Sequence, residues 1–245
     1  NNADACETTI KNWRTDGGTG RVWIGVETLY SMDGDRAPLG ALAALAEHHD
    51  AMLLLDEAHA TGVFGEDGRG LGAHLEGRQN VVSLHTCGKA LGASGALVLC
   101  SRTLRDFLVN RARAFIYATA PSPLVAAAVR AALRICANEP ERRAALQARI
   151  EFSGKLLQER LELAPSGSQI QPIIVGTDTR AVALAQQMKA LGYDIRAIRP
   201  PTVPEGTARL RLAITLNANS DDIAGLIDAL VQAQALVAED AEART

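Results

Sequence analysis

Three stretches within residues 21–57 decide the fold class: RVWIGVE (21–27), PLGALAALAEHH (38–49) and AMLLLDE (51–57). The first and the third are short apolar runs that each end in an acid, a pattern typical of buried strands. The middle stretch has apolar residues at helical spacing, and Pro38 stands where the first turn of a helix tolerates proline. Strand, helix and strand in this order predict a βαβ unit of a parallel sheet, which helices usually cover on both faces.

The same class of pattern continues toward the C-terminus. VVSLH (81–85) and GALVLC (95–100) are two further apolar runs of strand length. Long helical patterns follow at residues 103–116, 122–137 and 140–163. We therefore expect the first part of the chain to form an α/β domain.

The sequence changes in character after APSGSQ (164–169). The segments that follow read, in order, as strand, helix, strand, strand and helix: 170–176, 179–192, 193–198, 208–214 and 220–239. ARLRLAI, the fourth of these, alternates with period two, which suits a sheet with one uncovered face. We predict a smaller α+β domain at 137–245, with its boundary near residue 136 inside the helical stretch.

Composition excludes several classes of protein. The 245 residues are 47% hydrophobic and 22% charged, which is ordinary for a globular chain. The formal net charge of −3 gives no electrostatic reason to expect a nucleic acid or an anionic membrane as partner. No apolar run approaches the roughly 20 residues that span a bilayer, and the first residues lack the pattern of a signal peptide.

Cysteine and histidine usage gives no sign of a metal centre. The chain has four scattered cysteines: Cys6, Cys87, Cys100 and Cys136. Because none forms a C-x-x-C pair, we expect neither a disulfide framework nor a structural zinc site, as in a protein of the reducing cytoplasm. His48 and His49 are adjacent, so on a helix they should point in different directions and not share one metal ion. We predict no metal.

Polar side chains that could take part in binding or catalysis lie at the ends of three of the expected strands. They are Glu27, followed by SMDGD, Asp56 and His59 in DEAHATG, and Thr86 and Lys89 in HTCGKALGASG. Open α/β sheets bind ligands at the carboxyl ends of their strands, so these positions are candidates for one site. Each of them alone has a structural reading, since an acid after a strand is often a helix cap or a turn former.

Two nucleotide-binding alternatives fail on spacing. DEAH matches an element of a helicase class, in which the aspartate holds Mg²⁺, but that reading requires an upstream G-x-x-x-x-G-K-[ST] loop. Lys89 is followed by Ala90 and lies downstream of DEAH, so it does not supply that loop. GEDGRGLG (65–72) misses the G-x-G-x-x-G pattern of a dinucleotide site.

Taken together, the strand-end residues fit a site for pyridoxal phosphate (PLP). A carboxylate such as Asp56 keeps the pyridine nitrogen of this cofactor protonated, which strengthens it as an electron sink. A lysine beside a cationic centre is activated to bond the aldehyde of the cofactor. Ser31, Thr86 and the glycine-rich turn around Lys89 offer hydroxyls and backbone N–H groups for the phosphate.

Several long motifs resemble one family throughout the chain. These are SMDGDRAPL, LLLDEAHATGVFGEDGRG, TCGKALGASGA, FIYATAPSP and IRPPTVPEGTARLRLAIT. They are similar to the α-oxoamine synthases, PLP enzymes of fold type I with the aspartate aminotransferase fold. The resemblance implies that residues 1–136 are the C-terminal part of a large cofactor-binding domain. It also implies a truncated large domain, in which the N-terminal part that family members carry is missing from this chain.

The resemblance implies roles for the cofactor residues. Lys89 is the lysine that bonds the cofactor, Asp56 pairs with the pyridinium nitrogen, and His59 contacts the ring hydroxyl. Ser31 also contacts the cofactor, and Thr86 does so through the phosphate. Lys89, Asp56 and His59 are the expected catalytic residues.

Four further residues receive roles from the same resemblance. Thr119 reaches the phosphate in the neighbouring subunit of a homodimer with shared active sites, and Thr202 lines the substrate site. Arg211 or Arg209 holds the carboxylate of the amino acid, a task for which a bidentate arginine is well suited. Both arginines fall on one face of an alternating strand, so spacing does not choose between them, whereas the family pattern favours Arg211.

The activity implied is decarboxylative condensation of L-alanine with a pimeloyl thioester, carried by coenzyme A or by an acyl carrier protein. One alternative is a sister enzyme that uses glycine with an acetyl or succinyl thioester. One methyl group in a pocket is worth only about 1–3 kcal/mol, so the sequence does not decide between the two amino acids. A second alternative is a non-catalytic paralogue, against which the presence of Lys89, Asp56 and His59 argues.

Overall fold

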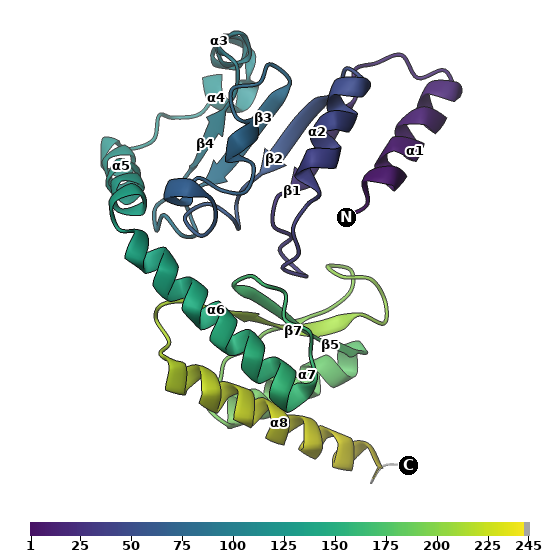
Figure 1. Ribbon diagram of the computed structural model, residues 1–245, viewed down its shortest axis with the longest axis vertical. Helices are drawn as coiled ribbons and strands as arrows, with labels where there is room; N and C mark the ends of the chain where they lie inside the picture. The colour runs from purple at the N-terminus through teal and green to yellow at the C-terminus, as the bar shows by residue number, and fades with distance from the viewer. Residues whose placement is uncertain (243–245) are drawn as a thin grey trace. The chain divides into compact units, whose positions relative to one another are not determined.

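The computed structural model describes residues 1–242, with side chains described through residue 237. The chain divides into two compact units. Unit 1 is Asn1–Tyr30 with Arg36–Arg143, and unit 2 is Ser31–Asp35 with the chain from Ala144 onward. Figure 1 labels most helices and strands of both units and colours the chain by position in the sequence. The main break therefore falls after Arg143, a few residues beyond the position 136 that the sequence suggested.

Unit 1 is built on a four-stranded sheet in the order β1-β2-β3-β4. Its strands are β1 (Trp23–Glu27), β2 (Met52–Asp56), β3 (Val81–Thr86) and β4 (Ala96–Leu99). The first three are parallel to one another, and β4 returns antiparallel to β3. Helix α2 (Leu39–His48) connects β1 to β2, so the predicted βαβ unit is confirmed.

One face of this sheet is closed by helices. Helix α1 (Ala3–Thr15), which the sequence analysis did not predict, packs there together with α2. Leu53 and Leu55 are completely buried, because alternate residues of β2 point to this face. Full burial of a leucine side chain stabilises a fold by roughly 1.5–3 kcal/mol. The main members of this core are Ile10, Ile24, Leu42, Ala46, Leu53 and Leu55.

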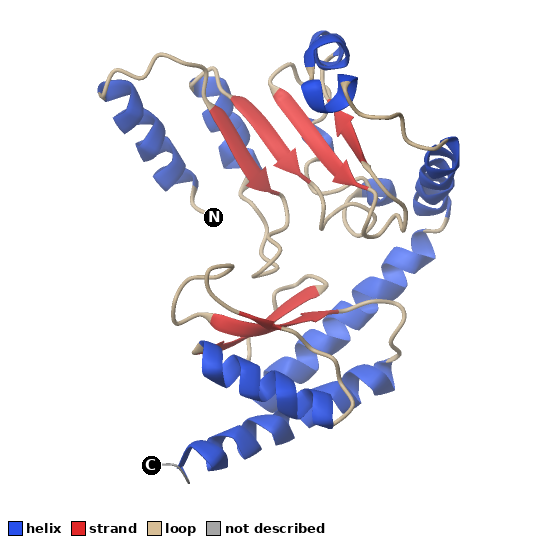
Figure 2. Ribbon diagram, turned by 180° about the vertical axis from the view of Figure 1, so that it is seen from behind, coloured by secondary structure: helices blue, strands red, loops and turns tan. Residues whose placement is uncertain are grey.

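Much of the other face is uncovered in the described residues. Trp23, Leu54 and Val98 are 55%, 37% and 51% exposed. In Figure 2 the strands are seen from this side, with α2 behind them. The expectation of helices covering both faces is therefore wrong for the described part of the chain, because α1 and α2 pack on the same side.

The helical region after β4 is more broken than the sequence suggested. The single helix expected at 103–116 is two helices, α3 (Arg102–Arg111) and α4 (Arg113–Ile116). Ala112 between them has an extended backbone, with φ −72° and ψ 107°, which interrupts the helical hydrogen bonds. Helix α5 (Pro123–Asn138) is capped by Ser122, whose side chain accepts a hydrogen bond from the Leu124 N–H.

Unit 2 has a three-stranded antiparallel sheet with helices on one face. Its strands are β5 (Ile170–Gly176), β6 (Ala197–Ile198) and β7 (Ala208–Ala213), in the order β5-β7-β6. Its helices are α7 (Asp178–Ala190), α8 (Ser220–Glu242) and most of α6 (Pro140–Leu161). None of the helices within residues 1–242 is long and apolar enough to cross a membrane.

The alternation of β7 organises the core of unit 2. Leu210 and Leu212 are buried against the helices, where Ile227 and Leu230 pack against them. The strand expected at 193–198 is shorter than predicted, because only Ala197 and Ile198 pair with β7. The N–H of Tyr193 instead donates to the carbonyl of Met188, so this residue closes the end of α7.

Candidate active site

The carboxyl ends of three parallel strands bring the expected residues of unit 1 to one edge. Glu27 and Asp56 are paired residues of β1 and β2, and Asp56 is paired with Leu84 of β3. Because side chains alternate along a strand, Thr86 lies on the same face as Leu84. Glu27, Asp56 and Thr86 therefore share the uncovered face of the sheet at its carboxyl edge.

A cavity of about 320 Å³ opens on this face beside Asp56. The Asp56 side chain is half-buried, and its Oδ1 accepts a hydrogen bond of 2.8 Å from the Ala58 N–H. This contact orients the carboxylate at the start of the turn that follows β2. The residues that line the cavity are Gly25, Val26, Glu27, Tyr30, Leu54 and Asp56.

Glu57, which the sequence analysis did not single out, fixes the backbone beside Asp56. It is fully buried, and its carboxylate accepts hydrogen bonds from the Thr28 hydroxyl at 2.7 Å and from two backbone N–H groups. These belong to Leu71 at 3.1 Å and Gly72 at 2.5 Å. A carboxylate with several donors ties the ends of β1 and β2 to the loop at 65–72.

Glycines at 70 and 72 are the sequence signal that could have revealed Glu57. A Cβ at Gly70 would lie 2.4 Å from Glu57 Oε2, and one at Gly72 would lie 2.7 Å from Oε1. Gly70 also has φ +96°, which side chains rarely adopt. The glycine-rich stretch that fails as a nucleotide loop thus lets the backbone approach a buried carboxylate.

A second buried network joins the turn after β2 to the end of β3. The Thr61 hydroxyl lies 2.9 Å from Nδ1 of the buried His85 and 2.8 Å from the carbonyl oxygen of Glu57, to which it donates. His85 Nε2 lies 3.3 Å from Glu76 Oε1. His85 directly precedes Thr86, so this network restrains the strand end that carries Thr86.

Lys89 lies in the turn between β3 and β4, and its neighbours explain how the turn is held. Cys87 and Leu91 are buried against Val129 of α5, whereas Lys89 between them is exposed. The Cys87 N–H donates to the Gly95 carbonyl at 2.9 Å, which closes the turn. Burial also raises the pKa of the Cys87 thiol. The lysine is therefore presented from an anchored turn.

The remaining expected residues of unit 1 lie in connecting segments. Thr86 is half-buried, with its hydroxyl 3.5 Å from the Gly88 N–H. His59 is half-buried in the turn after β2. Thr119 is exposed in the segment between α4 and α5.

The two arginines left open by the sequence differ in unit 2. Arg209 is 3% exposed and forms an ion pair with Asp33. Its guanidinium also donates to the carbonyls of Thr207, at 3.0 Å, and Met32, at 3.3 Å. Through its bonds to Asp33 and Met32, Arg209 attaches the segment Ser31–Asp35 to the rest of unit 2.

Arg211 is less buried than Arg209 and makes fewer hydrogen bonds. It is half-buried, and its Nη1 donates a hydrogen bond of 3.0 Å to the backbone carbonyl of Ser31. Thr202 is exposed in a turn, where its N–H donates to the Arg199 carbonyl at 3.0 Å. Ser31, Thr202, Arg209 and Arg211 thus all belong to unit 2.

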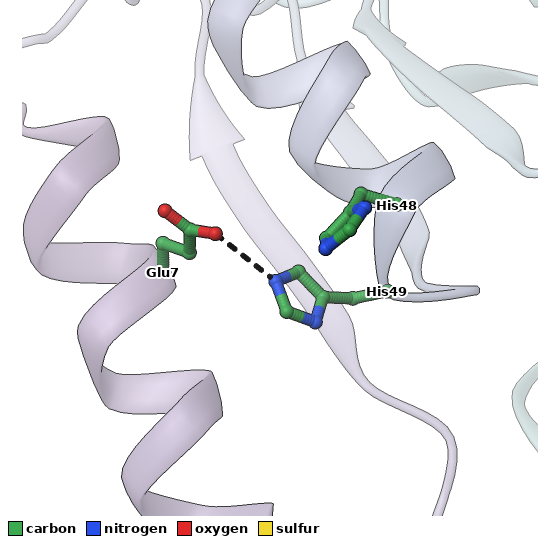
Figure 3. Close-up of side chains that lie close together, drawn as sticks. All are labelled: Glu7, His48 and His49. Carbon is green, nitrogen blue, oxygen red and sulfur yellow. Dashed lines mark ion pairs between the residues drawn. The ribbon is translucent and has the colours of Figure 1, made fainter.

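The side chains of the adjacent histidines His48 and His49 lie close together. His48 is the last residue of α2, and His49 follows it with φ −100° and ψ 12°. Their rings lie 4.8 Å apart, edge to face, and Glu7 of α1 faces them (Figure 3). The expectation that the two rings point in different directions is wrong, because His49 stands beyond the regular helix.

The sequence profile of the family "Aminotransferase class I and II" matches residues 1–230. The 8-amino-7-oxononanoate synthase of Chromobacterium violaceum is 44% identical over 218 residues, which cover 89% of this chain and 57% of that protein. The chain thus spans little more than half the length of this relative.

Two solved structures share the fold. The 8-amino-7-oxononanoate synthase of Francisella tularensis aligns with a TM-score of 0.74 and 26% identity, over 91% of this chain and 65% of that one. A high-resolution structure of serine palmitoyltransferase (SPT) with PLP as internal aldimine aligns with a TM-score of 0.81 and 26% identity. That alignment covers 88% of this chain and 55% of the SPT chain.

Proposed function

The chain belongs to the class I and II aminotransferase family, and on that premise we propose that its protein is a PLP-dependent 8-amino-7-oxononanoate synthase. The reaction condenses L-alanine with a pimeloyl thioester and gives 8-amino-7-oxononanoate, CO₂ and the free thiol. The observation that carries the proposal is the 44% identity to a synthase of this name, over a chain whose strand-end residues suit the cofactor.

The side chains at the carboxyl edge of the unit 1 sheet carry the chemical groups that PLP needs. Asp56 offers a carboxylate for the pyridine nitrogen, Thr86 a hydroxyl for the phosphate, and Lys89 an amine for the aldehyde. When bound, PLP withdraws electrons from the α-carbon of an amino acid and so weakens the bonds at that carbon. Asp56 suits its task because the Ala58 N–H already holds one of its oxygens.

Lys89 performs two tasks in this proposal. Its amine would hold the cofactor by its aldehyde, and the same amine would accept the proton of the substrate α-carbon. The turn anchored by Cys87 and Leu91 holds the backbone that carries this amine. His59, in the turn after Asp56, contacts the ring hydroxyl of the cofactor.

Unit 2 supplies the residues proposed for the substrate. We assign the carboxylate of alanine to Arg211, since Arg209 is buried and already paired with Asp33. Thr202 lines the substrate site, and Ser31, whose carbonyl accepts from Arg211, contacts the cofactor. A planar guanidinium that binds two carboxylate oxygens at once fixes the orientation of the amino acid.

The assembly and the location belong to the same proposal. The protein acts as a homodimer in which Thr119 binds the cofactor phosphate of the neighbouring subunit. Thr119 is exposed in a segment flanked by the large exposed side chains Tyr117 and Leu124, which suits a subunit contact. The four free cysteines agree with a cytoplasmic location.

The test is reduction of the PLP-loaded protein with borohydride, followed by peptide mass spectrometry and turnover assays. We expect the pyridoxyl group on Lys89 and not on Lys11, Lys155 or Lys189, and faster turnover with alanine and pimeloyl-CoA than with glycine and acetyl- or succinyl-CoA. Label at Lys89 with faster glycine turnover would establish the sister enzyme. Absence of label at Lys89 would favour the non-catalytic paralogue.

A further inference from the structure

Glu7, His48 and His49 form a cluster of potential metal ligands in unit 1, outside the proposed active site. One ligand atom from each residue lies within 4.8 Å of the other two. Glu7 comes from α1 and the histidines from the end of α2, so the cluster joins two helices that are far apart in sequence (Figure 3).

The separation of Glu7 and His49 suits a shared metal ion better than a hydrogen bond. Their atoms Oε1 and Nε2 are 3.6 Å apart, which is too long for a hydrogen bond. Two ligands on one tetrahedral Zn²⁺, each about 2.1 Å from the metal, lie roughly 3.4 Å apart. The distance in the structure is thus close to what the ion requires.

The burial of His49 adds a second observation. Its side chain is only 14% exposed, and the Nε2 atom is buried with no hydrogen-bond partner among the described residues. A buried nitrogen without a hydrogen-bond partner is costly, and a metal ion beside Glu7 would satisfy it. His48 is exposed, so its ring can rotate to bring a nitrogen to the same ion.

We propose that Glu7, His48 and His49 bind Zn²⁺ or a similar divalent transition-metal ion, which fastens α1 to the end of α2. Two imidazoles and one carboxylate are a donor set that such ions prefer, and water completes the coordination. The site is independent of the proposed reaction.

Lys11 is the competitor of the metal ion at this site. Its Nζ lies 2.9 Å from the same Glu7 Oε1 that faces His49. A bound cation must displace the ammonium group or share the carboxylate with it. Removal of the Lys11 charge should therefore tighten metal binding.

The experiment measures Zn²⁺ affinity of the purified protein by competition with a metal-binding dye, after removal of metal with a chelator. We expect one equivalent to bind with its affinity lowered more than about tenfold by His49→Ala, His48→Ala or Glu7→Gln, because even residues that only support metal ligands contribute this much. The exposed His74, which lies outside the cluster, provides the control His74→Ala, with unchanged affinity.

Lys11→Ala gives the outcome that a damaged fold does not produce, namely a several-fold gain in affinity. Circular dichroism without metal checks that each variant is folded. Equal affinity in wild type and His49→Ala, no Zn²⁺ binding to the folded wild type, or weaker binding in Lys11→Ala would each overturn the proposal.

Discussion

The two sheets of the molecule carry different kinds of side chain on the face that their helices leave uncovered. In unit 2 the helices bury Leu210 and Leu212 on one face of β7, and the opposite face carries Arg209 and Arg211. In unit 1 the face away from α1 and α2 carries the exposed Trp23, Leu54 and Val98. An exposed apolar sheet face is typical of an interaction surface, whereas arginines on a sheet face bind polar groups. In unit 1 the proposed catalytic residues therefore lie on a sheet with an exposed apolar face. In unit 2 the proposed substrate-binding arginine lies on the sheet face opposite a buried apolar core.

The largest expected effect separates the chemical role of unit 1 from the binding role of unit 2. Lys89→Ala should lower turnover of alanine and pimeloyl-CoA by more than about a thousandfold, as removal of a covalent catalytic group does. Its circular dichroism should be unchanged, because Lys89 is exposed. Lys155→Ala, at an exposed lysine of α6, is the matched control and should keep full turnover. Comparable losses in both variants would contradict the assignment.

The same leucine-to-alanine substitution in both sheets tests the difference in closure. Leu210→Ala in β7 removes a fully buried side chain and should lower the free energy of unfolding by about 2–5 kcal/mol. Leu54→Ala in β2 removes one that is 37% exposed and should cost less than half as much. Urea unfolding of each variant measures both values. Equal losses would mean that the open face of unit 1 is covered in solution.

Glu57→Gln tests whether the proposed active site depends on its buried carboxylate. The amide has one acceptor oxygen for the Leu71 and Gly72 N–H groups, so one buried donor loses its partner. We expect a loss of about 1–3 kcal/mol in unfolding free energy. Glu66→Gln, at an exposed acid of the same loop, should change it very little. If the two variants were equally stable, Glu57 would not hold the loop.

Arg211→Lys and Arg209→Lys test the assignment in unit 2. Lysine lacks the planar pair of donors, so Arg211→Lys should raise the KM for alanine about tenfold, or 1.4 kcal/mol, with a smaller change in kcat. Arg209→Lys should act mainly on stability, because Arg209 is buried with Asp33. The KM and the urea midpoint of each variant decide between them. A larger rise of KM in Arg209→Lys would reverse the assignment.

The smallest effect concerns thiols beneath the lysine turn. Burial raises the pKa of both Cys87 and Cys136, which line the cluster between this turn and α5. Since the thiolate is the form that reacts, the midpoint of alkylation against pH should lie higher in the folded protein than in the urea-unfolded chain. Mass spectrometry of the labelled peptides measures both midpoints. Coincident midpoints would mean that the cluster opens readily.

The sequence predicted the elements that depend on local pattern. The βαβ unit from β1 to β2 follows from apolar runs and helical spacing, and the fold class is confirmed by the family match. The edge that gathers Glu27, Asp56 and Thr86 follows from strand direction alone. The residue roles proposed for this edge come from the resemblance of its motifs to the α-oxoamine synthases.

Features that depend on distant contacts were beyond the sequence. Glu57 and Asp56 are adjacent acids in DEAHATG, and the sequence does not distinguish their roles. Only the hydrogen bonds of Glu57 to Thr28 and Gly72 reveal its structural role. Arg209 and Arg211 have the same alternation, and their difference arises because Asp33 meets only Arg209. The rings of His48 and His49 approach each other because α2 ends between them.

The segment Ser31–Asp35 has a consequence for how the chain is made. It belongs to unit 2, but Asp33 is separated from its partner Arg209 by 176 residues. At a synthesis rate of about 5–20 residues per second, Asp33 is synthesised roughly 9–35 s before Arg209. Through this interval the newborn chain holds the first strands of unit 1 beside a segment without its docking site. Ser31–Asp35 therefore reaches its final position only after Arg209 has been synthesised.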